Sequence, residues 1–275
     1  MNDPMIGLLY SKAAGRCVLC VMLRLGFPKL AARYLNSRYS RRLVPKYIEK
    51  YNIPMHEYPD QEYGSFGEFF SRQKPEQAAD PEPTHFVSPC DGWLSSYEIH
   101  RDSSFQIKGS QYRVSDLVDD DSVVDTFDGG LCLIFRLTPS DYHRYAFPDD
   151  GFIGYHHFIE GKLHSVQPIA CETYPVFRLN RRGWSILDTD NFGRIVQVEV
   201  GALAVGGIVT EKQNAPFRKG EEMGHFTLCG STIVLFIQKD RLELLPEMQS
   251  MNSGQEHRVS LGCCIGTQRQ PQHMN

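Results

Sequence analysis

A serine that directly follows a glycine, at Gly230-Ser231, is the strongest candidate for chemistry in this chain. Gly230 has no Cβ to crowd an atom that attacks its carbonyl carbon, and the Ser231 hydroxyl is the neighbouring nucleophile. Attack by Ser231 on its own preceding peptide bond would be an N→O acyl shift, and β-elimination of the resulting ester would cut the chain. A ketone, in the form of a pyruvoyl group, would then remain on residue 231. Gly-Ser-Thr is also common turn composition, so these residues by themselves leave both interpretations open.

Two side chains upstream could assist such a step. Asp91 stands in a Ser-Pro-Cys-Asp-Gly segment. Because Asp before Gly favours turns, a simple loop aspartate is the alternative interpretation. His143 lies between a tyrosine and an arginine, shortly after an apolar stretch, and a histidine can move protons near neutral pH. The alternative for this segment is a surface loop stabilised by an ion pair between Asp141 and Arg144.

A third segment reads Lys-Leu-His-Ser-Val and contains His164 and Ser165, and an Asn-Arg-Arg sequence follows at 180–182. The alternative interpretation is a strand followed by a basic turn. Taken one at a time, the structural interpretation of each segment is at least as strong as the functional one.

In their order and spacing, these segments resemble the phosphatidylserine decarboxylase family, and in particular its shorter, clostridial-type members. Four motifs carry the resemblance: Ser-Pro-x-Asp-Gly, Asp-Tyr-His-Arg-x-x-x-Pro, Ser-Val with the later Asn-x-Arg turn, and Lys-Gly-x-Glu-x-Gly-x-Phe-x-x-x-Gly-Ser-Thr. The Phe-Phe-Ser-Arg segment at 69–72 and the basic, apolar N-terminal region agree with it, so the similarity covers nearly the whole chain.

The resemblance implies a self-processing proenzyme that is cut between Gly230 and Ser231. The products would be a β chain, 1–230, and an α chain, 231–275, that begins with a covalent pyruvoyl group. The implied reaction converts phosphatidylserine to phosphatidylethanolamine and carbon dioxide through a Schiff base to that group, with no metal and no PLP. A homodimer is also implied.

The resemblance also assigns roles to single residues. Asp91 and Ser231 match the aspartate and the serine of the family's Asp–His–Ser processing triad, which acts like a serine protease that works once on itself. His143 matches the histidine that handles protons in decarboxylation. Ser165 matches the serine of the Ser-Val motif and is expected to contact the substrate adduct.

The chain departs from the family at the residue that should complete the triad. The family motif usually reads Asp-Tyr-His-Arg-x-His-x-Pro, and its second histidine is Ala146 here. Because general base catalysis contributes typically ~10²–10⁴-fold, cleavage should be slow unless another group replaces this base. His143, His164 and His225 are the candidate substitutes, and the sequence does not choose among them.

The composition is that of an ordinary globular protein, with 41% hydrophobic and 23% charged residues among 275. The net charge of −4 gives no support for nucleic-acid binding. Glycine-rich nucleotide loops, a Gly-x-Ser-x-Gly elbow and a His-x-x-x-His zinc pair are all missing from the sequence. His156 and His157 are adjacent, so on a strand they point to opposite faces and cannot share one metal.

Eight cysteines in a chain of this length do not form a disulfide framework. Cys17 and Cys20 lie in an apolar helical stretch without a matching pair, and the adjacent Cys263 and Cys264 suit neither a normal bridge nor a zinc site. We therefore expect reduced thiols in a reducing compartment.

The N-terminal region combines apolar and basic residues. Acidic residues are absent from 5–48, where leucines and valines alternate with lysines and arginines. No stretch reaches the ~18–20 apolar residues that a spanning helix needs. This pattern favours helices that lie in an anionic membrane interface, as in a peripheral protein on the cytoplasmic face of the cell membrane. The alternative is a helical cap packed on the domain with solvated basic residues.

The expected fold is α+β. Residues 1–75 form a helical, membrane-associating region, broken near Phe27-Pro28 and Val44-Pro45, and residues 76–275 form a mainly β decarboxylase domain. A Ser-x-x-Glu capping box at Ser65 opens one short helix. Runs rich in β-branched and aromatic residues predict strands at 131–137, 152–159, 195–200, 204–210 and 232–237.

Two other functions stay open. One is a pyruvoyl-dependent decarboxylase of a soluble amino acid. The other is a lipid-binding relative that remains unprocessed because Ala146 replaces the processing histidine.

Overall fold

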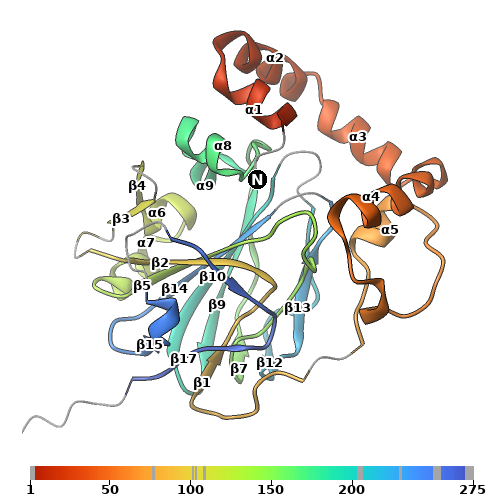
Figure 1. Cartoon of the computed structure of the whole chain (residues 1–275). Helices are drawn as coiled ribbons and strands as arrows, with labels where there is room; N and C mark the ends of the chain where they lie inside the picture. Colours follow the sequence, from red (N-terminus) through yellow and green to blue (C-terminus); the bar gives the residue numbers. More distant parts are fainter. Residues whose placement is uncertain are drawn as a thin grey trace, which may run out of the picture.

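The computed structural model of the chain describes the residues 4–75, 78–100, 102, 104–107, 110–202, 207–228, 231–249 and 255–269. Gly230, on one side of the predicted cleavage site, therefore lies outside the described residues. The described part has helices at the N-terminus and mainly β structure after them (Figure 1), so the predicted α+β fold is confirmed.

Short helices form the described part of the N-terminal region, and Figure 1 places the first three at one edge of the molecule. The predicted breaks near Phe27-Pro28 and Val44-Pro45 are confirmed, because α3 begins at Phe27 and α4 at Val44. Each proline lies in the first turn of its helix, where the missing N–H costs nothing. The elements are α1 (Pro4–Ser11), α2 (Ala13–Arg24), α3 (Phe27–Leu35), η1 (Arg38–Leu43), α4 (Val44–Tyr51), η2 (Met55–Glu57) and α5 (Phe66–Phe70).

Helix α5 begins where the sequence predicts. Ser65 is its N-cap, and its hydroxyl accepts a hydrogen bond from the Glu68 backbone N–H at 3.1 Å. The Glu68 carboxylate accepts from the Gly64 N–H at 2.8 Å. The phenylalanines of α5 pack in an aromatic cluster that also contains Tyr142 and Leu228 from the β-rich part. The division of the chain at residue 75 stays a prediction.

A nine-stranded antiparallel sheet forms the centre of the molecule, in the order β12-β7-β9-β10-β14-β5-β2-β16, with β8 also paired to β9. Its strands are β2 (Gly92–Glu98), β5 (Leu131–Arg136), β7 (Gly151–Ile153), β8 (His157–Ile159), β9 (Arg182–Thr189), β10 (Gly193–Val200), β12 (Ala215–Phe217), β14 (Thr232–Ile237) and β16 (His257–Val259). Strand β14 matches the predicted 232–237 and lies between β10 and β5.

Three smaller sheets surround it. One has the order β1-β17-β15, from β1 (His85–Val87), β17 (Cys264–Gln268) and β15 (Leu242–Leu244). The second has the order β11-β13-β6, from β11 (Ile208–Thr210), β13 (Glu222–Phe226) and β6 (Arg144–Ala146). The third pairs β3 (Ser104–Ile107) with β4 (Ser110–Arg113).

Short helical turns connect the strands. These are α6 (Val114–Leu117), α7 (Asp121–Val124), η3 (Asp125–Phe127), α8 (Pro168–Thr173), α9 (Val176–Leu179) and η4 (Pro246–Met248).

The large sheet is buried on both faces. Along β10, Val196, Val198 and Val200 belong to one hydrophobic core, whereas Ile195 belongs to the core on the opposite face. Strand β14 alternates in the same way, with Val234 in the first core and Ile233, Leu235 and Ile237 in the second. This double burial explains why β14 is a continuous apolar run rather than an alternating one.

The single strand expected at 152–159 is wrong. The chain pairs as β7, leaves the sheet over Gly154 to His156, and pairs again as β8. The prediction that the two adjacent histidines point to opposite faces fits the contacts. His157 stacks on Trp184 at 4.2 Å between ring centroids, whereas His156 bonds to the Ser185 hydroxyl.

Glu199 on β10 is fully buried and should make stability depend on pH. Its Oε1 accepts from the Gln197 amide at 2.8 Å, and its Oε2 has no hydrogen-bond partner among the described residues. Burial raises the pKa of Glu199 from 4.5 to about 8. The folded chain therefore keeps a proton that the unfolded chain releases, so this stabilisation is complete below pH ~4.5 and is lost as the pH rises through about 8.

We expect Glu199→Gln to flatten this dependence. Between pH 5 and 8 the free energy of unfolding of the parent should fall relative to that of the variant, on the order of a few kcal/mol. Urea unfolding at pH 5, 6.5 and 8 measures the difference, in a Ser231→Ala background so that every sample is one intact chain. Parallel curves for the two proteins would show that Glu199 does not carry the pH dependence.

Candidate active site

The register of the large sheet brings the predicted triad residues to one of its ends. Thr232 on β14 pairs with Arg136 on β5, and Arg136 pairs in turn with Trp93 on β2. Ser231 and Asp91 directly precede β14 and β2, so only β5 separates them. Neighbouring strands lie ~4.8 Å apart, which puts the two backbones ~10 Å apart. This separation is too large for direct contact and leaves room for one intervening side chain.

Ser231 is buried, with 1% of its surface exposed. Its carbonyl oxygen accepts a hydrogen bond from the Leu137 N–H at 3.0 Å, which extends the β14–β5 ladder by one residue. Its hydroxyl has no hydrogen-bond partner among the described residues. A buried, unengaged hydroxyl at the start of a rigid strand suits a nucleophile, because nothing has to be broken before it reacts.

Asp91 is held in place by two contacts. Its Oδ1 accepts from the Leu261 N–H at 2.9 Å, and its Oδ2 lies 3.8 Å from the Lys74 ammonium. Lys74 also pairs with Glu57 at 2.7 Å. Burial opposes the charge on Lys74, but the Glu57 hydrogen bond and the Asp91 charge together raise its pKa. Lys74 is therefore a cation that fixes the carboxylate, and it does not serve as a base.

Ala146 lies against the segment that carries Asp91. Its backbone N–H donates to the Pro89 carbonyl at 2.8 Å. Ala146 lines a cavity of about 910 Å³, and Asp91 lines an adjacent cavity of about 760 Å³. Lys74 and Leu261 line both. The position that carries the histidine in the family motif is therefore next to the aspartate and has space for a larger side chain.

His143 presents a free basic nitrogen inside the protein. Its Nδ1 lies 2.8 Å from the Asp141 backbone carbonyl, so Nδ1 carries the hydrogen and donates it. Its Nε2 is buried and has no partner among the described residues. The Phe70 ring covers the imidazole, with 4.1 Å between ring centroids. Burial lowers the pKa of His143 to about 4, against the opposing effect of the Asp141 carboxylate. The imidazole is therefore neutral at pH 7, with Nε2 able to accept a proton.

We expect His143 to stay neutral well below the usual range of histidine. In NMR spectra of Ser231→Ala protein with labelled histidine, its ring signals should not move between pH 8 and pH 5, because protonation of the buried ring begins only near its pKa of about 4. A His143 midpoint between pH 6 and 7 would contradict the neutral form as the resting state.

The ion pair considered between Asp141 and Arg144 does not form. Asp141 pairs with Arg258 at 2.6 Å, whereas Arg144 pairs with Glu222 and donates to the Ser71 carbonyl. The segment is a buried corner rather than a surface loop, since Asp141 is only 2% exposed. The Asp141–Arg258 pair anchors the turn that presents His143.

Ser165 and His164 lie on the other side of Ser231. The Asn180 side chain donates to the carbonyls of His164 and Gly201, and Gly201 follows the β10 residue that pairs with Thr232. The Tyr10 hydroxyl of α1 accepts from the Ser165 N–H at 2.9 Å and lies 3.3 Å from His164 Nδ1. The His164 ring thus contacts the Tyr10 hydroxyl of α1 and stacks on Tyr174. These contacts disfavour His164 as the missing base.

His225 is tied to carboxylates. Its Nδ1 lies 3.4 Å from Glu211, and it stands on β13 opposite Arg144. Burial lowers the pKa of His225, and the nearby Arg144 lowers it further. Phe226, the next residue, points into the core that contains Ile233, so His225 projects from the opposite face of its strand. Among the described residues, His143 Nε2 and His225 Nδ1 are both buried without a hydrogen-bond partner, but His225 Nδ1 faces the Glu211 carboxylate. We therefore take His143 as the substitute base to test.

Comparison with known proteins decides the family. A family model described as phosphatidylserine decarboxylase matches residues 66–267. Phosphatidylserine decarboxylase proenzyme 2 of Clostridium acetobutylicum is 39% identical over 263 residues, which cover 94% of this chain and 90% of the relative. The proenzyme of Clostridium novyi is 36% identical over 275 residues, covering 97% and 93%. The chain belongs to the phosphatidylserine decarboxylase family. The resemblance inferred from the four motifs is thereby confirmed.

Three residues that contact the candidate site of this family member were not found by sequence reasoning: Lys74, Arg258 and Tyr10. Each contacts a motif residue that lies far away in the chain, 155 positions away in the case of Tyr10 and Ser165. Lys74 follows the Phe-Phe-Ser-Arg segment closely, so proximity to that motif was the one available signal. No motif near Arg258 or Tyr10 in the sequence indicates that these residues contact the site.

Proposed function

We propose that this chain is a self-processing phosphatidylserine decarboxylase that cuts itself between Gly230 and Ser231. The observation that carries the proposal is the Ser231 hydroxyl, which is buried and unengaged at the start of β14 in a chain of this family. Asp91 would supply the charge, and the neutral His143 the basic nitrogen, that such a step needs.

The cut can be written with all atoms balanced. Ser231 Oγ bonds to the Gly230 carbonyl carbon, its proton passes to a base, and the C–N bond breaks as the nitrogen takes a proton. Removal of the Ser231 α-proton then expels the Gly230 carboxylate and leaves a dehydrated residue. Water converts that residue to a ketone and releases ammonia. In this chain Ala146 cannot supply the base, so we assign the first proton to His143 Nε2.

The residues fit a pyruvoyl group at position 231, which would act as the electron sink for decarboxylation, as PLP does elsewhere. The Ser231 carbonyl stays bonded to the Leu137 N–H, so the adjoining backbone is held in the ladder while the group reacts. His143 can hold the proton that returns to the product carbon. We assign Ser165 a contact with the bound substrate. Its backbone N–H already donates to the Tyr10 hydroxyl.

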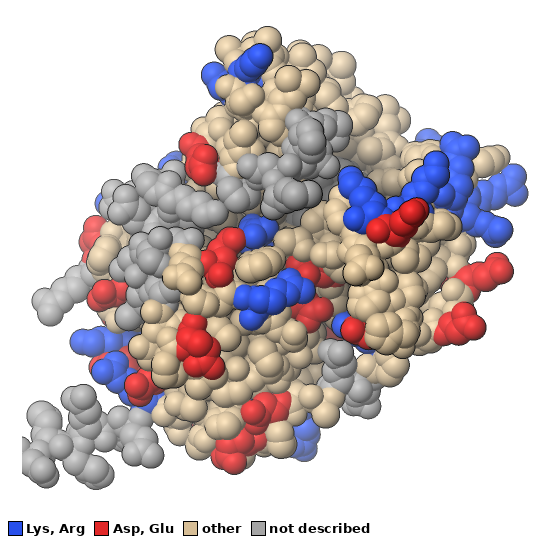
Figure 2. All heavy atoms as spheres, in the orientation of Figure 1, with Lys and Arg blue, Asp and Glu red and all other residues tan. Residues whose placement is uncertain are grey.

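The N-terminal helices supply a surface suited to lipid. On α1 to η1 the large apolar residues that stand more than a third exposed are Leu8, Val18, Val21, Leu25, Phe27, Leu30, Tyr34 and Tyr39. Lysines and arginines gather over the α3 and α4 flank of the same region (Figure 2). No helix in the described ranges is long and apolar enough to cross a membrane. We propose peripheral contact with anionic lipid, on the cytoplasmic face of the membrane.

We expect the double variant Leu25→Glu and Leu30→Glu to weaken binding to vesicles at least ~10-fold. These side chains are 75% and 64% exposed, so the change removes apolar contact and adds repulsion without disturbing the fold. Cosedimentation with vesicles that contain phosphatidylserine, at low and high salt, measures the effect. Phe158→Glu, at an exposed apolar site on β8 outside the N-terminal helices, is the control. Equal losses in both variants would rule out the α1–η1 surface as the lipid contact.

Release of carbon dioxide from two substrates separates the possible functions. Activity on phosphatidylserine in detergent micelles, with none on free serine, supports the proposal. Activity on a free amino acid without lipid would instead show a soluble amino-acid decarboxylase. Vesicle binding by an uncut chain with no release from either substrate would show a lipid-binding relative. Sedimentation of the same sample tests the homodimer that the family resemblance implies.

A further inference from the structure

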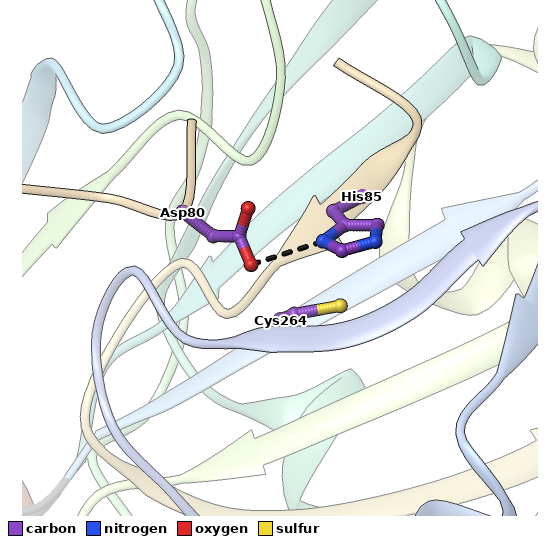
Figure 3. A group of neighbouring side chains, drawn as sticks. All are labelled: Asp80, His85 and Cys264. Carbon is purple, nitrogen blue, oxygen red and sulfur yellow. Dashed lines mark hydrogen bonds and ion pairs between the residues drawn. The ribbon is translucent and has the colours of Figure 1, made fainter. Parts of the chain in front are cut away.

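Three possible metal ligands of different chemistry meet on the rim of the small sheet that contains β1 and β17. Asp80, His85 and Cys264 each offer one ligand atom, and these atoms lie within 4.8 Å of one another. Figure 3 shows the Asp80 carboxylate pointing at the His85 ring, with the Cys264 sulfur beside them. The three side chains are neither fully buried nor fully exposed. None of them takes part in the Ser231 site.

The spacing of these atoms suits a small tetrahedral cation. Asp80 Oδ2 and His85 Nδ1 are 3.0 Å apart. Two such atoms bound to tetrahedral Zn²⁺ at ~2.0–2.1 Å would lie ~3.3 Å apart. A metal could therefore replace the hydrogen between them with almost no movement. Cys264 Sγ now makes only a weak contact with the Gly266 carbonyl, at 3.3 Å, so its rotation toward the pair breaks little.

The surrounding hydrogen bonds hold the ligands in place. The Asp80 N–H donates to the Gly262 carbonyl at 3.0 Å, which ties this ligand to the turn before Cys264. Asp80 Oδ1 accepts from the Glu82 N–H at 2.9 Å, so the second carboxylate oxygen is fixed. The His85 N–H donates to the Glu82 carbonyl. Hydrogen bonds of this kind, which orient a ligand through its other polar atoms, also support the ligands of known metal sites.

The surroundings favour the ionised form of Asp80 but not that of Cys264. The hydrogen bond from His85 lowers the pKa of Asp80, and the Lys219 ammonium adds to this effect. Burial raises the pKa of the Cys264 thiol, so metal binding must release its proton and should strengthen as the pH rises. Lys219 opposes a cation by repulsion. Its Nζ is, however, held by the Glu82 and His85 carbonyls at 2.6 and 2.8 Å.

We propose that Asp80, His85 and Cys264 form a Zn²⁺ site, with water as the fourth ligand. Thiolate and imidazole select Zn²⁺ over Mg²⁺ and Ca²⁺, which prefer oxygen ligands. The sequence excluded zinc because Cys263 and Cys264 are adjacent, and that argument holds only for a site built from both. The fold instead pairs one of them with ligands from residues 80–85.

The position of the site gives it a role that rests on the proposed function. Asp80 and His85 precede the Gly230–Ser231 bond and Cys264 follows it. In a chain cut at this bond, the metal would join the β chain to the α chain. Metal binding itself does not depend on the cut, so the test uses the uncleavable Ser231→Ala protein.

The experiment is a Zn²⁺ titration of reduced, metal-free Ser231→Ala protein by calorimetry, followed by Co²⁺ substitution to detect a thiolate–metal absorption band. We expect one Zn²⁺ per chain, no response to Mg²⁺, and an affinity at least ~10-fold lower when Cys264→Ser is added. Asp80→Asn, a nearly isosteric change, should lower the affinity as well. Cys263→Ser is the matched control and should leave both affinity and Co²⁺ band unchanged.

Two results would overturn the proposal. One is the failure of the Ser231→Ala protein to bind Zn²⁺. The other is equal affinity and an equal Co²⁺ band in the Cys264→Ser and Cys263→Ser proteins, which would move the metal to other thiols such as Cys17 and Cys20. Because Ser231→Ala cannot be cut in any case, neither result bears on whether the parent chain processes itself.

Discussion

Ser231→Ala should leave the protein as a single 31.4 kDa chain with no decarboxylase activity. The variant lacks the hydroxyl to which we assign the attack on the Gly230 carbonyl, and without the cut no pyruvoyl group can form at position 231. The loss should therefore be complete rather than partial. Intact-mass analysis measures the cut, through the disappearance of fragments 1–230 and 231–275, and carbon dioxide release measures the activity.

The matched control for this variant is Ser96→Ala. Ser96 on β2 of the same sheet is also 1% exposed, and its hydroxyl also has no hydrogen-bond partner among the described residues, so the substitution removes an equivalent hydroxyl that plays no part in the proposed cut. Thermal unfolding of both proteins separates chemistry from folding. Decarboxylation that persists in folded Ser231→Ala protein would refute the pyruvoyl proposal outright.

Ala146→His should accelerate self-cleavage by ~10²–10⁴-fold, the usual contribution of a general base. The new imidazole would enter the cavity beside Lys74 and Leu261, next to the aspartate of the triad. The strands that follow Asp91 and Ser231 are separated only by β5, so a base near Asp91 would have a short path to the serine hydroxyl. The rate of appearance of fragment 231–275 after refolding of the uncut chain gives the measurement.

Two further variants test the reason for that gain. Ala146→Phe fills the same space without a base and should not accelerate the cut. Adding Asp91→Asn to Ala146→His should remove most of the gain, because the aspartate orients the imidazole and stabilises its charged form. Equal cleavage rates in the parent and in Ala146→His would mean that another group, which we take to be His143, already serves as the base at full efficiency.

The parts of the fold that could be predicted from the sequence are those decided by local chemistry. Strand β14 is bounded as expected because its apolar, β-branched run is buried on both faces. The α5 cap at Ser65 follows from a side chain that bonds three residues ahead. The strand expected at 152–159 was wrong because pairing with β9 stops over Gly154 to His156, and partner choice is not visible in one segment.

The candidate site also has residues that could be predicted from the sequence and residues that could not. Motifs in the sequence identified Ser231, Asp91 and His143 as site residues. The sheet register explains why Ser231 and Asp91 lie at the same end of the large sheet. Their supports could not be predicted, because Arg258 contacts Asp141 and Tyr10 contacts Ser165 only after the chain has folded. The side-chain partners of the motif residues thus come from segments without any motif of their own.

The position of β14 between β10 and β5 affects the kinetic stability of the processed protein. Residues 231–275 contribute this interior strand, the edge strand β16, and β15 and β17 of the small sheet. In a chain cut before β14, the fragment 231–275 therefore contributes strands to two sheets. It cannot dissociate unless both sheets open. Once it has left, its return is a bimolecular reaction that competes with aggregation. We expect the processed form to persist through slow unfolding rather than through a reversible equilibrium.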